Sequence, residues 1–229
     1  MNLVMLDVDG TLTQSYDYDR EIFGLAIAEV LKCPLVDADL NGYVDKTSLG
    51  VTREAIQRIT GRNPEAKEIE EVKRRVLWHL ERMYKESPEV FSEVPGARGF
   101  VERLRKLEGA GVAIATGCWR SEAVFKLRAS GLNVDDIPMA SSDDDRNRMR
   151  IMEMAVGRAQ DLYASPVFER VAYLGDGPWD VEASHLLGYN FIGIGPRLQG
   201  LKEPRNFGWH QDFLEIEAVL ASVTAALKP

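Results

Sequence analysis

A short apolar run followed at once by two carboxylates and a glycine limits which folds this chain can adopt. Leu3-Val4-Met5-Leu6 shows no polar alternation, which is typical of a strand buried on both faces of a sheet. Asp7-Val8-Asp9-Gly10-Thr11 follows it directly. Two carboxylates two residues apart point the same way if the strand continues, and a glycine then allows a sharp turn. We therefore predict that Asp7 and Asp9 lie together at the carboxyl end of a buried strand.

Three further apolar runs occur along the chain, and helical patterns separate them. The runs are 112–115, 171–174 and 191–194, and the helical patterns cover about 98–107, 121–131, 147–163 and 179–187. Strands that alternate with helices indicate the α/β class. We predict a Rossmann-like, three-layer core in which helices cover both faces of a parallel sheet. In such sheets ligands bind at the carboxyl ends of the strands.

One long segment interrupts this alternation, because it reads almost entirely as helix. Its apolar residues recur at helical spacing in two groups, which are Ile22, Phe23, Ala26, Ile27, Val30 and Leu31, and then Ile69, Val72, Val76, Leu80 and Met83. We therefore predict an all-helical cap domain of residues 14–95. It would be inserted into an α/β core made of residues 1–13 and 96–229.

Two more polar motifs follow predicted strands. Thr116-Gly117 comes after the second run, and Gly175-Asp176-Gly177-Pro178-Trp179-Asp180 comes after the third. All these side chains would meet at one edge of the sheet, although Asp in the second motif could instead be a simple helix cap. Clustered carboxylates repel one another unless a cation holds them, and an all-oxygen site suits Mg²⁺. A carboxylate can attack phosphorus, and a second one can carry the proton.

The charge balance and the lack of long apolar runs exclude several kinds of partner. The chain has 28 Lys and Arg against 36 Asp and Glu, a formal net charge of −8. Nucleic acids and anionic membranes attract basic surfaces, so neither is expected as a partner. No apolar run approaches the ~20 residues that span a bilayer, and the N-terminal residues do not form a secretory signal. We therefore expect a cytoplasmic protein, either a monomer or a homodimer.

In the order and spacing of these motifs, the chain resembles the haloacid dehalogenase (HAD) superfamily. The likeness is to its phosphatase branch, and in particular to phosphoglycolate-phosphatase-like members with a helical cap between the first and second motifs. The resemblance implies that Asp7 is a nucleophile that forms an aspartyl-phosphate and that Asp9 is the general acid/base. It also implies that Mg²⁺ is held by Asp7, by Asp176 and by the carbonyl of Asp9, with Asp180 supporting this metal shell. Thr116 and the amide of Gly117 would bind the phosphoryl group.

The third motif of that family departs from its usual form here. It is usually a Lys at the start of the helix before the fourth-motif strand, but residues 141–150 hold three Arg and no Lys. Spacing favours Arg146 for this role, with Arg148 as the alternative. Lys126 could also reach inward. The arginines could instead pair with the neighbouring acids of residues 143–145 on the surface.

Two further positions are candidates for contact with the substrate. Lys46 lies in a predicted cap loop and would contact an anionic group, although a solvated loop is the other interpretation. Trp119 follows Thr116 closely and would line the entrance to the site. The function predicted overall is hydrolysis of a small phosphorylated metabolite with Mg²⁺ as cofactor.

Three alternative functions remain open from the sequence. The first is a phosphomutase on the same scaffold. The second is a phosphonate C–P hydrolase, which would need a cap lysine for a Schiff base, either Lys46 or Lys32. The third is a catalytically degenerate member that only binds its ligand.

Overall fold

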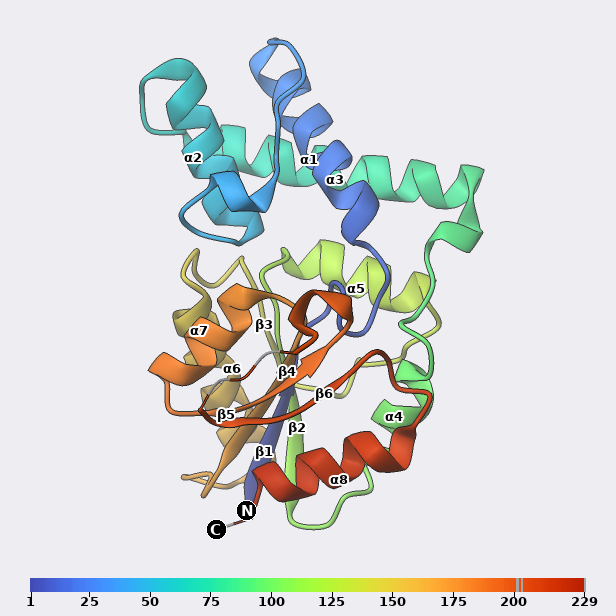
Figure 1. Cartoon of the computed structure of the whole chain (residues 1–229). Coiled ribbons are helices and arrows are strands. Elements are labelled where there is room, and N and C mark those ends of the chain that lie inside the picture. Colours follow the sequence, from blue (N-terminus) through green and yellow to red (C-terminus); the bar gives the residue numbers. More distant parts are fainter. Residues whose placement is uncertain (201, 203, 229) are drawn as a thin grey trace.

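The computed structural model describes residues 1–200, 202 and 204–228, apart from the side chains of residues 16, 17 and 40. At its centre lies a six-stranded parallel sheet in the order β3-β2-β1-β4-β5-β6 (Figure 1). The strands are β1 (Asn2–Leu6), β2 (Ala110–Ala115), β3 (Met139–Ala140), β4 (Val171–Gly175), β5 (Asn190–Ile194) and β6 (Asn206–His210). The first strand along the chain is thus central, with neighbours on both sides.

Helices cover both faces of this sheet, which confirms the predicted three-layer α/β core. One face packs on α4 (Ala97–Leu104), α5 (Arg120–Ala129) and α8 (Ile216–Ala226), and the other on α6 (Arg148–Tyr163) and α7 (Pro178–Leu186). Alternate residues of β1 point to opposite faces. Val4 and Leu6 join the first cluster, whereas Leu3 and Met5 join the second. All four are fully buried, as the unbroken apolar run predicted.

Three elements had no counterpart in the sequence prediction, namely β3, β6 and α8. The strand β3 has only two residues, too few to show a period of two. The edge strand β6 includes Gly208, is only partly buried, and shifts register against β5. The strands β3 and β6 therefore form because they pair with a neighbouring strand, and their own residues give no strand pattern.

Three helices lie above the carboxyl ends of the strands (Figure 1). They are α1 (Tyr16–Leu31), α2 (Ser48–Thr60) and α3 (Ala66–Glu86), and together with their connections we call them the helical insert. Their apolar faces meet in a separate core that contains Ile22, Ile27, Val72, Val76 and Leu80, all from the two predicted groups. Among the described residues, none of the helices combines the length and the apolar character that crossing a lipid bilayer requires.

The two connections between the helical insert and the core run side by side. The amide of Gln14 donates to the carbonyl of Ser92 at 2.9 Å, and the amide of Val94 donates to that of Leu12 at 2.9 Å. Thr13 and Glu93 form an antiparallel bridge between them. The chain therefore leaves the core and returns to it at one place.

Candidate active site

The motifs that follow β1, β2 and β4 come together beneath the helical insert. Asp7, Asp9, Thr116, Gly117 and Asp176 all line one cavity of about 310 Å³. The opposite wall of that cavity comes from α1, α2 and the loop between them. The sheet edge and the helical insert thus enclose a single space of the size that small ligands occupy.

Three carboxylates cluster at one side of this cavity, which two of them, Asp7 and Asp176, line. Asp7, Asp176 and Asp180 are buried, and each offers an oxygen within 4.8 Å of the others. Burial and the neighbouring Asp180 charge raise the pKa of Asp7 well above its usual range, and the same two causes raise the pKa of Asp176 to about 7. Oxygen ligands at this spacing fit a hard divalent cation, which would relieve the repulsion.

A glycine lets two of these strand ends approach closely. Gly10 has φ +77°, a left-handed conformation, and a Cβ placed there would stand 2.0 Å from the carboxylate of Asp176. On the other side, Asp180 accepts a hydrogen bond from the amide of Gly177 at 3.0 Å, just before α7 begins. Gly10 therefore makes room for the carboxylate of Asp176, and the amide of Gly177 holds that of Asp180.

Arg148 is a cation that reaches this cluster from α6. It is the first residue of α6, whose N-cap is Asn147. Its Nη1 lies 2.8 Å from Asp180 and 3.4 Å from Asp7. Burial opposes the charge of Arg148, but the Asp180 charge raises its pKa above the usual value, so the guanidinium stays protonated. Its buried Nε has no hydrogen-bond partner among the described residues.

Arg146 lies elsewhere, so the structure reverses the order of preference predicted for the two arginines. Its side chain is 59% exposed and pairs with Asp45 at 3.4 Å. The reason is the helix boundary: Arg146 precedes the N-cap Asn147 and stands in a surface turn, whereas Arg148 opens the helix and points to the strand ends. The structure therefore places Arg148, and not Arg146, against the acidic cluster.

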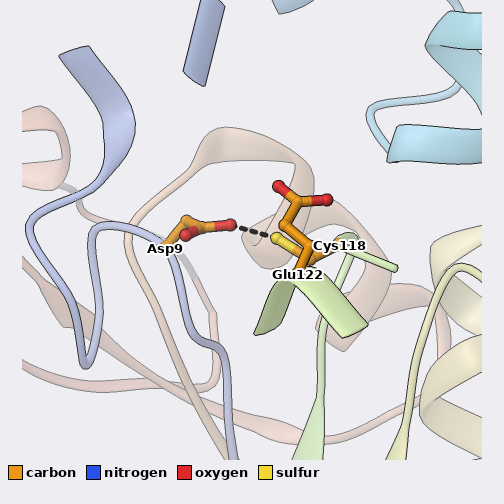
Figure 2. Close-up of side chains that lie close together, drawn as sticks. All are labelled: Asp9, Cys118 and Glu122. Atoms are coloured by element: carbon orange, nitrogen blue, oxygen red, sulfur yellow. Dashed lines mark hydrogen bonds between the residues drawn. The ribbon is translucent and has the colours of Figure 1, made fainter. Parts of the chain in front are cut away.

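Asp9 is held by several donors from other elements. Cys118 and Ser15 both donate to its carboxylate, and Lys126 Nζ lies 3.0 Å from Oδ1. Burial alone would raise the pKa of Asp9, but the Lys126 ammonium and these hydrogen bonds lower it overall. Figure 2 shows the thiol of Cys118 pointing at Asp9, with Glu122 beside it.

The group Asp9, Cys118 and Glu122 has ligand atoms close enough to hold a second cation. The ammonium of Lys126 already lies within 3.0 Å of Asp9 and 2.8 Å of Glu122. A positive charge is thus present among these groups, and a second metal ion would be repelled by it. Arginines also lie beside the cluster of Asp7, Asp176 and Asp180, but that cluster offers oxygen ligands alone, which a hard divalent cation prefers to a set that includes a thiol.

Thr116 and Gly117 occupy positions suited to an anion. The buried Thr116 hydroxyl accepts from the amide of Cys118 at 3.1 Å, so its own proton can be donated into the cavity. A Cβ at Gly117 would stand 2.5 Å from Nη2 of Arg148 and 3.0 Å from the carbonyl of Lys46. Only glycine therefore lets the guanidinium lie against this loop.

Of the two predicted substrate contacts from the loops, the structure brings one to the cavity. Lys46 lines it, and its ammonium donates to the carbonyl of Tyr43. Trp119 is 1% exposed and stacks on Phe23 of α1, with ring centroids 5.5 Å apart, so it packs the helical insert onto α5. Trp179 lines the cavity in its place.

Several residues of the site were not singled out in the sequence. Tyr173 donates its hydroxyl to the carbonyl of Ala115 at 3.0 Å and lies 3.3 Å from Arg148. Arg197 pairs with Asp176 at 3.1 Å. The hydroxyl of Tyr173 within an apolar strand was a usable signal, because a buried polar group needs a partner. Arg197 follows a strand end that carried no motif.

Comparisons with known proteins agree with this architecture. The sequence model of a family of haloacid dehalogenase-like hydrolases matches residues 1–188. No curated protein matches the chain significantly. Among solved structures, a hydrolase from Pseudomonas syringae is 21% identical with a TM-score of 0.68, over 97% of this chain and 99% of that one.

Two more solved structures share the fold. CbbY from Rhodobacter sphaeroides, in complex with phosphate, is 18% identical with a TM-score of 0.67, over 94% of this chain and 96% of that one. A mutant of that protein has been solved with xylulose 1,5-bisphosphate. A predicted phosphoglycolate phosphatase from Haemophilus somnus is 18% identical with a TM-score of 0.60, over 96% of this chain and 98% of that one.

Proposed function

The chain belongs to the haloacid dehalogenase-like hydrolase family, and from that premise we propose that it is a Mg²⁺-dependent phosphomonoester hydrolase acting on a small phosphorylated metabolite. The observation that carries this proposal is the place of Asp7. Its buried carboxylate faces a cavity between two further carboxylates and the guanidinium of Arg148. A nucleophile, a metal site and a fixed cation at one point are what phosphoryl transfer to a carboxylate needs.

In the first half of the reaction, Asp7 attacks phosphorus. A bond forms between a carboxylate oxygen and phosphorus while the bond to the leaving alcohol breaks, and Asp9 gives its proton to that alcohol. Arg148, the Thr116 hydroxyl and the Gly117 amide hold the phosphoryl oxygens, which carry the charge of the transition state. Mg²⁺, when bound, would neutralise further charge on the same oxygens.

In the second half, water cleaves the aspartyl-phosphate. Asp9 takes a proton from this water, phosphate leaves and the carboxylate of Asp7 is restored. The lowered pKa of Asp9 suits this step, because burial is outweighed by Lys126 and the carboxylate is held in its ionised form. The first half requires the protonated form, and the Cys118 and Ser15 donors can turn to accept from it, because a hydroxyl or thiol does both.

The residues present fit the metal that this chemistry uses. Asp7, Asp176 and the carbonyl of Asp9 would hold Mg²⁺, and Asp180 would support them through its contact with Arg148. Burial and the Asp180 charge raise the pKa values of Asp7 and Asp176 even though Arg148 and Arg197 lie beside them, so a bound divalent cation would favour their ionised forms.

The helical insert would act as a cap that closes over the substrate, and Lys46 would contact it from above. Support for a phosphorylated substrate comes from the solved relatives: CbbY is in complex with phosphate, and its mutant with a bisphosphate. The alternative of a C–P hydrolase needs a lysine amine at the site. Lys46 lines the cavity, whereas Lys32 caps the end of α1 and is not among the described lining residues.

The test is hydrolysis of p-nitrophenyl phosphate by the purified chain, with excess Mg²⁺ and with EDTA. We expect activity that EDTA abolishes and that Asp7→Asn reduces at least about 10³-fold. Asp161→Asn, a matched change of an exposed aspartate on α6, should leave the rate unchanged. Activity in EDTA or in Asp7→Asn would contradict the mechanism.

A second assay separates the alternatives. Borohydride trapping with a phosphono-aldehyde would label wild type but not Lys46→Met if the chain were a C–P hydrolase. Transfer of phosphate between two sugar positions would reveal a mutase. Binding of phosphate without turnover of any substrate would indicate a catalytically degenerate member that only binds its ligand.

A further inference from the structure

Lys126 is a buried cation outside the motifs of the proposed mechanism. Its side chain is fully buried on α5, and its ammonium contacts three carboxylates: Glu122 at 2.8 Å, Asp9 at 3.0 Å and Asp19 at 2.7 Å. A buried ammonium is costly unless partners satisfy it. Burial lowers the pKa of Lys126, but the charges of Asp19 and Asp9 raise it by more. The pKa therefore lies above its usual value, and the ammonium stays charged.

The three carboxylates come from three different parts of the chain. Glu122 lies one helical turn before Lys126 on α5. Asp9 belongs to the motif after β1, at the floor of the cavity. Asp19 belongs to α1, in the helical insert above it. One ammonium therefore connects the proposed acid/base of the core with the part of the chain that would move as a cap.

The other titratable groups around this ammonium are few. Cys118 Sγ lies 3.8 Å away, after β2. Tyr18, next to Asp19 on α1, lies within its electrostatic reach. If the helical insert moves away, Lys126 loses Asp19 and keeps Asp9 and Glu122, which share its own side of the cavity. The set of carboxylates that share the ammonium thus depends on the position of the insert.

We propose that Lys126 is a positioning residue that holds the Asp9 carboxylate toward the leaving oxygen and ties that orientation to the closed helical insert through Asp19. The proposal rests on the proposed function. Lys126 binds Oδ1 of Asp9, while Cys118 binds Oδ2, so the plane of the carboxylate is fixed from two sides. Asp19 binds the ammonium only while α1 lies over it.

A comparison of two leaving groups tests this, because only one of them needs Asp9. Phenyl phosphate and p-nitrophenyl phosphate have nearly the same shape, but phenolate is the poorer leaving group and depends more on a proton donor. The measurement is kcat/KM, which covers all steps through release of the phenol. Loss of the Lys126 ammonium makes Asp9 easier to protonate, so a loss of proton donation in Lys126→Met would come from orientation. We expect this variant to lower kcat/KM at least about tenfold more for phenyl phosphate than for p-nitrophenyl phosphate. A purely structural role would lower both equally.

Asp19→Asn serves as the second variant, since it leaves Lys126 paired with Asp9 and Glu122 and is expected to fold. It should change the ratio of the two rates in the same direction by a smaller factor. Lys73→Met is the matched control, because Lys73 of α3 also pairs an ammonium of the insert with a core carboxylate, that of Asp143. That control should leave the ratio unchanged.

The outcomes separate this inference from the proposed function. If wild type hydrolyses p-nitrophenyl phosphate with Mg²⁺ and through Asp7, but Lys126→Met and Asp19→Asn leave the ratio of rates at its wild-type value, the positioning role is wrong and the function stands. If wild type hydrolyses neither ester, the function fails first.

Discussion

Nη1 of Arg148 lies 3.4 Å from the carboxylate of Asp7. A cation at this distance from the proposed nucleophile can hold a phosphoryl oxygen at the point of attack. We therefore expect Arg148→Ala to lower kcat/KM for p-nitrophenyl phosphate by about 10²–10³-fold. Arg146→Ala, which removes an exposed arginine, should change it by less than about twofold. The reverse order in steady-state assays would return the role to Arg146.

We expect a side chain at position 117 to lower activity, although the backbone of Gly117 does not have a positive φ. A Cβ there would stand 2.5 Å from Nη2 of Arg148, so Gly117→Ala should displace the guanidinium. We expect kcat/KM to fall by about ten- to a hundredfold while the thermal midpoint stays within a few degrees of wild type. Gly157→Ala, on α6 where a Cβ meets nothing within 4 Å, is the control. A fully active Gly117→Ala would show that Arg148 can move without cost.

Mg²⁺ should stabilise the protein more at high pH than at low pH. Burial and the Asp180 charge raise the pKa of Asp176 from 3.8 to about 7 in the folded chain. A raised folded pKa means that protonation favours folding, so this stability is complete below about pH 4 and is lost as pH rises through about 7. Without metal, the thermal midpoint should therefore be lower at about pH 8 than at about pH 5.5.

Excess Mg²⁺ replaces the lost protons, so it should raise the midpoint at the higher pH and have little effect at the lower one. Differential scanning fluorimetry at the two pH values measures both effects. Asp176→Asn should remove most of the response to Mg²⁺. An equal shift by Mg²⁺ at both pH values would contradict the assignment of this cluster as the metal site.

Trp119 should matter for stability rather than for substrate contact. It is 1% exposed and lies in the apolar core of the helical insert against Phe23. Trp119→Ala should lower the free energy of unfolding by about 3–5 kcal/mol, measured by urea denaturation. Trp78→Ala, at a position 42% exposed, should cost about 0.5 kcal/mol. A large rise in KM with unchanged stability would show that Trp119 contacts substrate after all.

The sequence was sufficient for the layered core because its central strands carry their own signal. Residues 3–6 and 171–174 form uninterrupted apolar runs. Each run is followed by a motif of Asp and Gly, residue types that are unfavourable inside a strand. The strand β3 gave no such signal, since its two residues are a strand only because Ile114 and Ala115 pair with them. Pairing is a property of the tertiary structure and cannot be read from two residues.

The site was predictable where a residue sits at a strand end and unpredictable where a helix sets its direction. Asp7 and Asp176 lie where the motifs placed them, at the edge beneath the helical insert. The choice between Arg146 and Arg148 depended on one helix boundary, and a boundary is the least certain part of a helical pattern. Asp19 meets Lys126 only because the folded chain brings α1 close to α5 at this point, which no local pattern encodes.

The paired connections at residues 12–14 and 92–94 have a consequence for how such a chain can change over time. The insertion begins and ends at neighbouring points, so it can lengthen, shorten or be exchanged for another while β1 keeps its partners. Mutations that alter which molecules are accepted and mutations that alter the chemistry would then fall in different stretches of one gene. Selection could act on the two separately, except at the contacts where both meet, such as that between Asp19 and Lys126.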